Sequence, residues 1–402
     1  MLSDLDAILR SHDIDALIVP MHEAMHPSFR WLSRGAKLTK GFVVKKVGAD
    51  PLLVYFPMER DEAAASGLPA ASVLDFGHEQ AHREESHAPR ALARFFRNLL
   101  DAQSIRGGVS FAGNLPFEMY LETAEELEKS GIRLVRLGGT NPVQLARKRK
   151  DAREVELIRS VGERTEAVVD RVRELLRGTR VENGRVMHGT GVLKLGDLKA
   201  LVSQEVVRLG MLEDHETILS QGRDAAIPHS RGDAAAEVMA SVPIVLDIFP
   251  MDAATGYFFD TTRTFCVGEV PEELARIHAL VLEAFTMAAG SVRAGTPASS
   301  YQHMVCDFFE KHGFATIRSN PATTDGYVHG LGHGVGLDVH ERPSFSILPS
   351  NQDLIEVGDI ITIEPGLYFP ERGIGVRIED TFHVDESGRA VTLCRGDRGL
   401  AP

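Results

Sequence analysis

Four acidic residues in the second half of the sequence stand in or beside apolar, strand-like segments. Asp247 ends the apolar run in VPIVLDIFP, and Asp260 lies in YFFDTTRT. Glu364 ends the apolar run ITIE, and Glu379 lies in VRIED. A carboxylate in an apolar setting needs a cation, a hydrogen-bond donor or a metal ion as its partner. Any fold of this chain must therefore provide such partners for all four residues.

The spacing of these residues predicts that they converge. The segment PMDAATG between Asp247 and Asp260 is turn-like, so the flanking strands are expected to form a hairpin that brings both carboxylates together. A proline and a glycine follow Glu364 and are expected to stop its strand. Glu379 is expected on the same strand face as Arg377.

The segment HGLGHGVGLDVHERP (329–343) places three histidines among four regularly spaced glycines. In an extended strand, His329 and His333 would share one face and lie about 13 Å apart, too far to bind one metal ion. One histidine is therefore expected to be a ligand, and the others, including His340, are expected to face the substrate. The glycines would let another backbone or a substrate approach closely.

Four carboxylates and a histidine together indicate a metal site. Four negative charges can share one pocket only if something cancels them, and two divalent cations would carry the matching positive charge. Oxygen-rich ligation with one imidazole favours Mn²⁺, Fe²⁺, Co²⁺ or Zn²⁺ over a metal that prefers sulfur. The alternative interpretation is that each acid forms an ordinary structural ion pair.

The length and the residue pattern predict two domains, because 402 residues are too many for one ordinary core. In residues 1–150, helical and strand-like segments alternate, which predicts an α/β layer domain. Residues 151–402 mix helices with antiparallel-type strands and lack a repeating βαβ unit, so this part is expected to be α+β. The basic segment 145–178 is expected to be a linker that runs into a long helix.

Charge and cysteine content argue against several classes of protein. A net charge of −13 disfavours a nucleic-acid partner, because phosphate binding requires clustered lysines and arginines. No apolar run approaches the length of a membrane span, and the charged N-terminal segment is unlike a signal peptide. The three cysteines are far apart, which is typical of the reducing cytoplasm. A cytoplasmic globular enzyme is expected.

The motifs resemble those of a known family. HGLGHGVGLDVHE, ITIEPGLY and GVRIED, preceded by LDIFP and GYFFDTTRTF, are similar to the pita-bread metallopeptidases of the aminopeptidase P and prolidase type. Residues 1–150 resemble the creatinase/prolidase N-terminal domain in size and pattern. The resemblance implies an α/β N-terminal domain with a linker and, over residues 151–402, an α+β pita-bread catalytic domain.

The resemblance also implies a ligand set, which is Asp247, Asp260, His333, Glu364 and Glu379. These residues would hold two divalent metal ions per chain, with Mn²⁺ preferred over Co²⁺, Zn²⁺ or Fe²⁺. Asp260 and Glu379 would bridge the ions, and a hydroxide bound between the ions would be the nucleophile. Glu364 would shuttle protons, and His340 would stabilise the oxyanion. The remaining matches to active-site positions of the family are His229, His329, Tyr368 and Arg377.

The implied activity is hydrolysis of the peptide bond before proline in small peptides that carry proline at the second position, by a homodimer. Arg342 and Arg372 are expected to hold the free carboxylate of a dipeptide, because a guanidinium pairs with a carboxylate through two parallel hydrogen bonds. This favours an Xaa-Pro dipeptidase. The alternatives are an Xaa-Pro aminopeptidase for longer peptides, a metal-free creatinase-like hydrolase and a non-catalytic binding module.

The sequence departs from the family pattern at four points, one of which is an interval between Asp247 and Asp260 that is two residues longer than usual. The first ligand is followed by Ile-Phe instead of Xaa-Gly, and Ser344 stands where archaeal prolidases carry an arginine that can hold the substrate carboxylate. Residues 179–200 form a longer segment than is usual. None of these changes removes a ligand.

Overall fold

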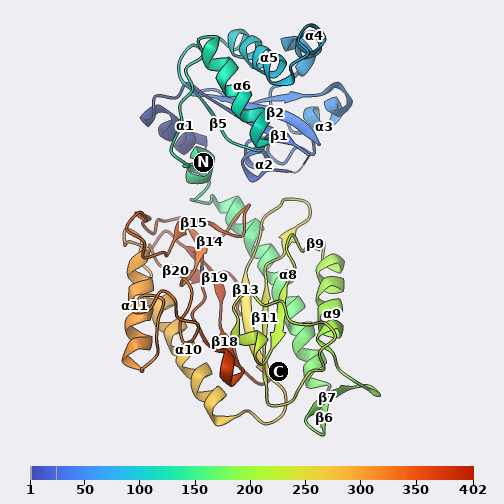
Figure 1. Cartoon of the computed structure of the whole chain (residues 1–402), viewed down its shortest axis with the longest axis vertical. Helices are drawn as coiled ribbons and strands as arrows, with labels where there is room; N and C mark the ends of the chain where they lie inside the picture. Colours follow the sequence, from blue (N-terminus) through green and yellow to red (C-terminus); the bar gives the residue numbers. More distant parts are fainter. Residues whose placement is uncertain (1, 24) are drawn as a thin grey trace. The chain divides into compact units, whose positions relative to one another are not determined.

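The computed structural model describes residues 2–23 and 25–402, which divide into two compact units (Figure 1). The first unit extends to Arg147, and the second comprises Lys148–Pro402. The boundary that the sequence predicts, near residue 150, lies beside this division. Within the described ranges, none of the helices combines the length and the apolar character that a membrane span requires.

The first unit contains a five-stranded sheet in the order β4-β3-β2-β1-β5. β1 is antiparallel to β2 and parallel to β5, while β3 is antiparallel to β2 and parallel to β4. The central strands are rich in apolar residues, as expected for a sheet that is covered on both faces. The strands are β1 (Ala16–His22), β2 (Lys40–Lys46), β3 (Leu52–Tyr55), β4 (Ala70–Ser72) and β5 (Val109–Phe111).

Helices cover both faces of this sheet. Successive side chains of β1 point to opposite faces, so that Leu17 and Val19 pack in one cluster with residues of α1, and Ile18 packs in another with residues of α5. The unit is therefore an α/β layer structure. Its helices are α1 (Leu2–Ser11), α2 (Pro27–Leu32), α3 (Arg60–Ala65), α4 (His78–Glu84), α5 (Ala88–Ala102), α6 (Phe117–Lys129) and α7 (Pro142–Ala146), with short 3₁₀ turns η1 (Pro57–Glu59) and η2 (Val73–Phe76).

The second unit contains several small antiparallel sheets. One has the order β10-β11-β13, another has the order β15-β14-β16-β19-β20, and β17 and β18 form a hairpin. The strands of these sheets are β10 (Ile218–Gln221), β11 (Pro243–Ile248), β13 (Thr261–Cys266), β14 (His333–Gly334), β15 (Glu341–Ser344), β16 (Ile360–Ile363), β17 (Gly366–Phe369), β18 (Ile374–Arg377), β19 (Asp380–Val384) and β20 (Ala390–Thr392). A further pair is β9 (Met211–Leu212) with β12 (Met251–Asp252).

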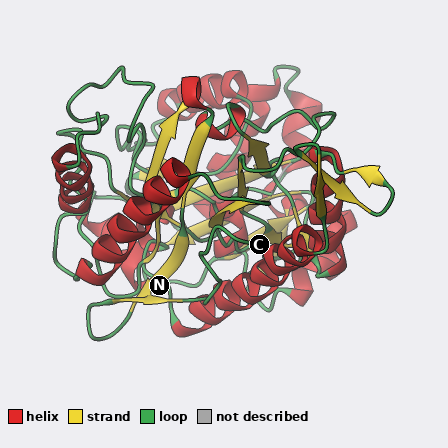
Figure 2. Ribbon diagram, turned by 90° about the horizontal axis from the view of Figure 1, so that it is seen from below, coloured by secondary structure: helices red, strands yellow, loops and turns green. Residues whose placement is uncertain are grey.

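Four long helices flank these strands. α8 (Ala152–Arg177) and α9 (Leu195–Arg208) lie on one side, and α10 (Glu272–Ser291) and α11 (Ser299–Lys311) lie on the other (Figure 1). Figure 2 shows from below how helices enclose the strands. The predicted long helix is α8, which begins with a capping box in which Asp151 and Glu154 each accept the other's backbone N–H. A 3₁₀ turn, η3 (Asp224–Ala226), precedes the cavity residue His229, and another, η4 (Pro370–Arg372), joins β17 to β18.

The long segment 179–200 forms a small antiparallel sheet and the start of α9. Its strands are β6 (Arg180–Glu182), β7 (Arg185–His188) and β8 (Gly191–Val192).

Two other segments each form two strands, which are separated at the acidic residue that the segment carries. Glu364 and a proline separate β16 from β17, as predicted. Residues 373–384 form two strands, β18 and β19, and between them Glu379 pairs through its backbone with Thr262 of β13.

A glycine allows α8 to pack closely against Phe259, the residue before Asp260, and against Cys394. A Cβ atom on Gly162 would lie 2.5 Å from Cys394 Sγ and 2.5 Å from the ring of Phe259. Gly290, in α10, has no such neighbour within 4 Å. Only the first of these two helical glycines is therefore required by packing.

Gly162→Val is expected to lower the free energy of unfolding by about 1–3 kcal/mol or more, because extra methyl groups at a filled position force the backbone apart. Gly290→Ala is the control and is expected to raise the free energy by up to about 1 kcal/mol through helix propensity. Urea denaturation measures both. A Gly162→Val protein as stable as the wild type would contradict the close approach of α8.

Candidate metal centre

Five side chains in or beside the strands of the sheets β10-β11-β13 and β15-β14-β16-β19-β20 line one cavity, whose volume is 520 Å³. Asp247 lies in β11, Asp260 directly precedes β13, and Glu364 directly follows β16. β11 and β13 are paired strands, as the predicted hairpin requires. The cavity thus contains all of the residues that the sequence predicts as ligands, namely Asp247, Asp260, His333, Glu364 and Glu379.

His333 lies between the carboxylates. Its Nε2 atom is 3.7 Å from Asp260 Oδ2 and 3.6 Å from Glu364 Oε1. Ligand atoms of Asp260, His333 and Glu379 all lie within 4.8 Å of one another. His333 Nδ1 is 3.1 Å from the carbonyl oxygen of Gly334, and a carbonyl can only accept, so Nδ1 carries the proton. Burial lowers the pKa of His333 to about 3, so the ring is neutral and Nε2 presents a lone pair to the cavity.

Three carboxylate oxygens in this group are buried without a hydrogen-bond donor among the described residues. They are Asp247 Oδ1, Asp260 Oδ1 and Glu379 Oε1. Buried acceptors are almost always satisfied in proteins, so their grouping in one cavity needs an explanation. A set of carboxylate oxygens with one imidazole nitrogen is suited to Mn²⁺, Fe²⁺, Co²⁺ or Zn²⁺. The residues present therefore fit divalent metal ions.

The carboxyl groups affect one another's protonation strongly. Burial, reinforced by the charges of Asp247 and Glu364, raises the pKa of Asp260 well above its usual value. Burial and the charge of Asp260 have the same effect on the pKa of Glu379. Burial also raises the pKa of Glu364 to about 8, against the opposing effect of Arg377. Without cations, burial and mutual repulsion therefore favour the protonated forms of these groups.

A buried arginine and a threonine fix the other oxygens of two carboxylates. Arg377 pairs with Asp247 Oδ2 and donates through Nε to Thr262 Oγ1 at 3.1 Å. Thr262 in turn donates to Glu379 Oε2 at 2.6 Å. Because these oxygens are held, Asp247 and Glu379 keep Oδ1 and Oε1 free for a cation. The sequence pointed to Arg377 but not to Thr262, although Thr262 follows Asp260 at the two-residue spacing of a strand face.

His329 also lines the cavity, but both of its ring nitrogens are engaged. Arg377 Nη1 donates to the Tyr368 hydroxyl at 2.9 Å, so this hydroxyl can use its own proton toward His329 Nε2, which lies 2.8 Å away. His329 Nδ1 then donates to the carbonyl of Gly330 at 2.7 Å. Burial lowers the pKa of His329 to about 3. The ring is therefore a fixed, neutral wall, and Tyr368 is buried behind it.

His229 and His340 line the cavity as well. The His340 ring is exposed and lies edge-on to the ring of His333, with 4.3 Å between the ring centres. Behind His340, a buried ion pair joins Lys150 Nζ to Glu341 Oε2 at 2.8 Å. Glu341 Oε1 accepts the backbone N–H of Leu337 at 2.8 Å, so the start of the second unit fixes the segment that carries His340.

The expected extended strand from His329 onward is wrong, because only His333 and Gly334 form β14, and a bulge interrupts their pairing with β15. His329 Nδ1 lies 3.9 Å from Glu364, so both histidines approach the same carboxylate. The expected close approach of another backbone is confirmed at two of the four glycines. A Cβ atom at Gly332 would lie 2.2 Å from the carbonyl oxygen of Thr362, and one at Gly334 would lie 2.1 Å from that of Arg342.

Neither of the arginines expected to hold a substrate carboxylate lines the cavity. Arg342 pairs with Asp353 at 2.5 Å. Arg372 pairs with Glu273 and stacks on Phe369, with 3.6 Å to the ring centre.

Another arginine does line the cavity and was not anticipated. Arg231 lies two residues after His229, on the cavity wall that also carries His215 and Glu216. These three residues belong to no motif, and only the proximity of Arg231 to His229 in the sequence could have drawn attention to it.

Residues 156–386 match the family model of metallopeptidase family M24. The chain belongs to this family. It is 33% identical over 193 residues to an Xaa-Pro dipeptidase of Pyrococcus furiosus, a match that covers 46% of this chain and 49% of that protein. The chain thus spans about half the length of this curated relative.

Solved structures show that this M24 chain has the pita-bread fold with an N-terminal α/β unit. It resembles the prolidase from Pyrococcus horikoshii OT3, with a TM-score of 0.75 and 22% identity over 99% of both chains. It also resembles the X-Pro aminopeptidase from Thermotoga maritima MSB8, with a TM-score of 0.74 and 20% identity over 100% of this chain and 99% of that one. Both resemblances establish the fold.

We expect the metal-free protein to lose stability as the pH rises from about 7 to about 8.5. Folding raises the pKa of Glu364 from 4.5 to about 8. The protonated carboxyl group therefore stabilises the folded protein fully below pH 4.5, and this stabilisation is lost as the pH rises through about 8. Each unit of pKa difference corresponds to roughly 1.4 kcal/mol. The depressed pKa values of His329 and His333 act only at lower pH, because both rings are neutral above about pH 7.

Calorimetry of chelator-treated protein at the two pH values measures this effect. Excess Mn²⁺ is expected to remove the difference, because the cations replace the protons on the carboxyl groups. A metal-free protein that is more stable at the higher pH would contradict the prediction.

Proposed function

We propose that this chain is a metal-dependent exopeptidase that hydrolyses the peptide bond before proline, with dipeptides as its preferred substrates. The supporting observation is the set of ligand side chains in one cavity, with three buried oxygens that lack donors. The relatives carry the names Xaa-Pro dipeptidase, prolidase and X-Pro aminopeptidase. A complete ligand set argues against a metal-free hydrolase and against a non-catalytic module.

Asp247, Asp260, His333, Glu364 and Glu379 would hold two divalent ions in this cavity. Mn²⁺ is the proposed metal, with Co²⁺, Zn²⁺ and Fe²⁺ as alternatives. When bound, such ions supply a water activated for nucleophilic attack and polarise the scissile carbonyl.

The protein groups have separate roles in the proposed reaction. Glu364 receives the proton of the attacking water and passes it to the proline nitrogen as the peptide bond breaks. His340, which is exposed at the cavity, donates to the substrate carbonyl oxygen as that oxygen gains negative charge. His229 and His329 flank the proline ring, and His329 does not move protons because Tyr368 and Gly330 occupy its nitrogens.

Asp260→Ala and Glu379→Ala are each expected to abolish hydrolysis of Xaa-Pro peptides and to remove bound metal, because each residue is a proposed ligand with a buried oxygen that lacks a donor. Metal content measured by mass spectrometry and peptide hydrolysis measured on the same samples test this. Normal metal content with wild-type rates in either variant would refute the ligand assignment.

His340→Ala is expected to retain metal and to lose about 100-fold or more in kcat, because its contribution is made at the transition state. KM is expected to change little. Loss of both metal ions from this variant would mean that His340 holds metal rather than substrate.

Arg231 is the proposed partner of the dipeptide carboxylate. The arginines of the cavity wall are Arg231 and Arg377, and Arg377 is buried with its donors directed to Asp247, Thr262, Tyr368 and Pro228. Arg231 is more than half exposed and approaches Glu216 only at 3.5 Å. Glu216 has a closer partner, Lys199, at 2.8 Å. The guanidinium of Arg231 therefore has donors for a ligand.

Arg231→Gln is expected to raise KM for Xaa-Pro by about 10- to 100-fold, which corresponds to roughly 1.5–3 kcal/mol for hydrogen bonds to a charged group. Hydrolysis of the matching Xaa-Pro amide is expected to change little, because the amide lacks the carboxylate. Arg342→Gln and Arg372→Gln serve as controls and are expected to change neither reaction. If the wild-type enzyme hydrolyses Xaa-Pro-Yaa amides as fast as Xaa-Pro, the aminopeptidase alternative replaces the dipeptidase proposal.

A homodimer and a cytoplasmic location, which the sequence implies, stay predictions. Sedimentation analysis of the purified protein tests the first, and fractionation of the source cells tests the second.

A further inference from the structure

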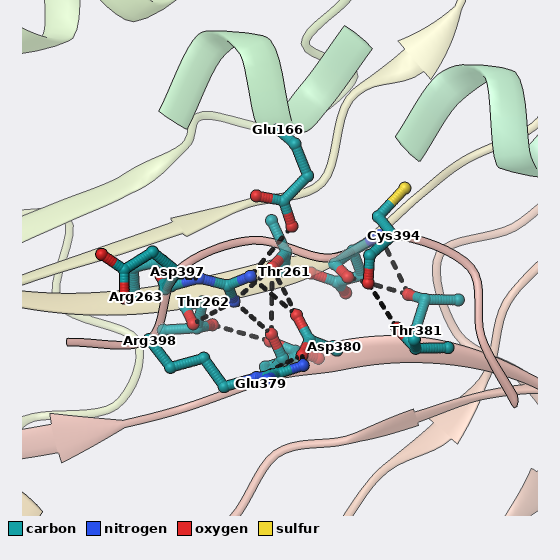
Figure 3. A network of polar contacts seen from close by, with 12 residues as sticks. Glu166, Thr261, Thr262, Arg263, Glu379, Asp380, Thr381, Cys394, Asp397 and Arg398 are labelled. Carbon is teal, nitrogen blue, oxygen red and sulfur yellow. Dashed lines mark hydrogen bonds and ion pairs between the residues drawn. The ribbon is translucent and has the colours of Figure 1, made fainter. Parts of the chain in front are cut away.

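Glu379 is held from the side opposite the cavity by a buried arginine (Figure 3). Arg263, in β13, is 1% exposed and donates through Nη1 to the backbone carbonyl oxygen of Glu379 at 2.7 Å. The hydroxyl of Thr261 donates to the same carbonyl oxygen at 2.9 Å. On the cavity side, Thr262 holds the side chain of Glu379. Three consecutive residues of β13 therefore fix both the backbone and the carboxylate of one proposed ligand.

Two carboxylates neutralise Arg263. Its Nη2 atom lies 2.8 Å from Asp380 Oδ1 and 2.9 Å from Glu166 Oε1. Asp380 directly follows Glu379 and is itself buried. Its second oxygen, Oδ2, accepts from Arg398 Nε at 2.6 Å (Figure 3). The Arg263–Asp380 pair is thus completed by a residue from a segment that does not line the cavity.

The segment that carries Arg398 passes directly over the side chain of Arg263. Arg263 Nε donates to the backbone carbonyl of Asp397 at 3.0 Å. A Cβ atom on Gly396 would lie 2.4 Å from Arg263 Nη2, so only glycine lets the chain approach this closely. The backbone carbonyl of Leu400 accepts the N–H of Cys266 at 2.8 Å, which holds the segment along the end of β13.

We propose that the segment Gly396–Arg398 is the outer support of the metal centre: through Arg263 and Asp380 it positions Glu379 and so sets the affinity for the divalent ions. The inference rests on the proposed metal centre. A ligand oxygen must be placed to within about 0.5 Å, and the groups that orient ligands contribute roughly 10- to 100-fold to metal affinity. Arg263, Asp380 and Arg398 are positioning residues, because none of them touches the substrate or the ions.

The test is Mn²⁺ binding by chelator-treated protein, measured by titration calorimetry. Arg398→Gln is expected to weaken Mn²⁺ binding by about 10-fold, and Arg398→Lys is expected to recover part of the loss because it keeps a cation beside Asp380. Arg318→Gln is the matched control. Arg318 is likewise a partly buried arginine in ion pairs, with Asp307 and Glu310, and its exposed fraction is 26% against 28% for Arg398, which pairs with Asp380. The control is expected to bind Mn²⁺ within about twofold of the wild type.

Thermal unfolding of Arg398→Gln and of Arg318→Gln without metal separates an effect on Mn²⁺ affinity from an effect on general stability. Weaker Mn²⁺ binding by Arg398→Gln alone, at equal thermal stability, supports the inference. Equal Mn²⁺ affinity in Arg398→Gln and the wild type overturns it and leaves the proposed function intact. Absence of Mn²⁺, Co²⁺ or Zn²⁺ binding by the wild type overturns the metal centre itself. If Arg398→Gln does not fold, Gly396→Ala displaces the same segment from Arg263, and unchanged Mn²⁺ affinity in that variant would also refute the inference.

Discussion

Burying four carboxylates in one cavity has a large cost in free energy, and the polar residues around the cavity of the second unit are arranged to offset it. Burial and the charges of neighbouring carboxylates raise the pKa values of Asp260, Glu364 and Glu379, so the cluster can exist only with protons, fixed cations or bound metal ions. Arg377 is a buried cation at the cavity, and its donors hold one oxygen of Asp247 and, through Thr262, one oxygen of Glu379. The remaining charge is left for ions, and the unpaired oxygens mark where they would bind.

The segment Thr261–Arg263 connects the cavity to the interior of the unit. Side chains alternate along a strand, so Thr262 faces the carboxylates while Thr261 and Arg263 face away from the cavity. Arg263 and Arg377 therefore hold opposite sides of the same ligand. Buried ion pairs give little net stability, but they specify one arrangement of their neighbours. A metal centre needs such an arrangement, because ligand geometry determines which ion binds.

The residues proposed as ligands could be predicted to share one site because their signals in the sequence are local. An acid at the end of an apolar run, such as Asp247 or Glu364, needs a partner wherever the strand lies. Thr262, Arg263 and Arg231 could not be predicted, because their roles depend on which strands and loops become neighbours. Arg342 and Arg372 failed as cavity residues for the same reason: their nearest carboxylates, those of Asp353 and Glu273, come from other segments.

The contacts of the site join residues that are far apart in the sequence. Lys150 and Glu341 are 191 positions apart, Arg263 and Asp397 are 134 apart, and Asp247 and Arg377 are 130 apart. Long separations delay contact formation during folding. A nascent chain that has emerged as far as residue 360 carries Asp247, Asp260 and His333 but not Arg377, which pairs with the first of these. During synthesis, the strands that carry these acidic residues therefore emerge before Arg377 is available to pair with Asp247. The proposed metal centre is then among the last parts of the unit to assemble.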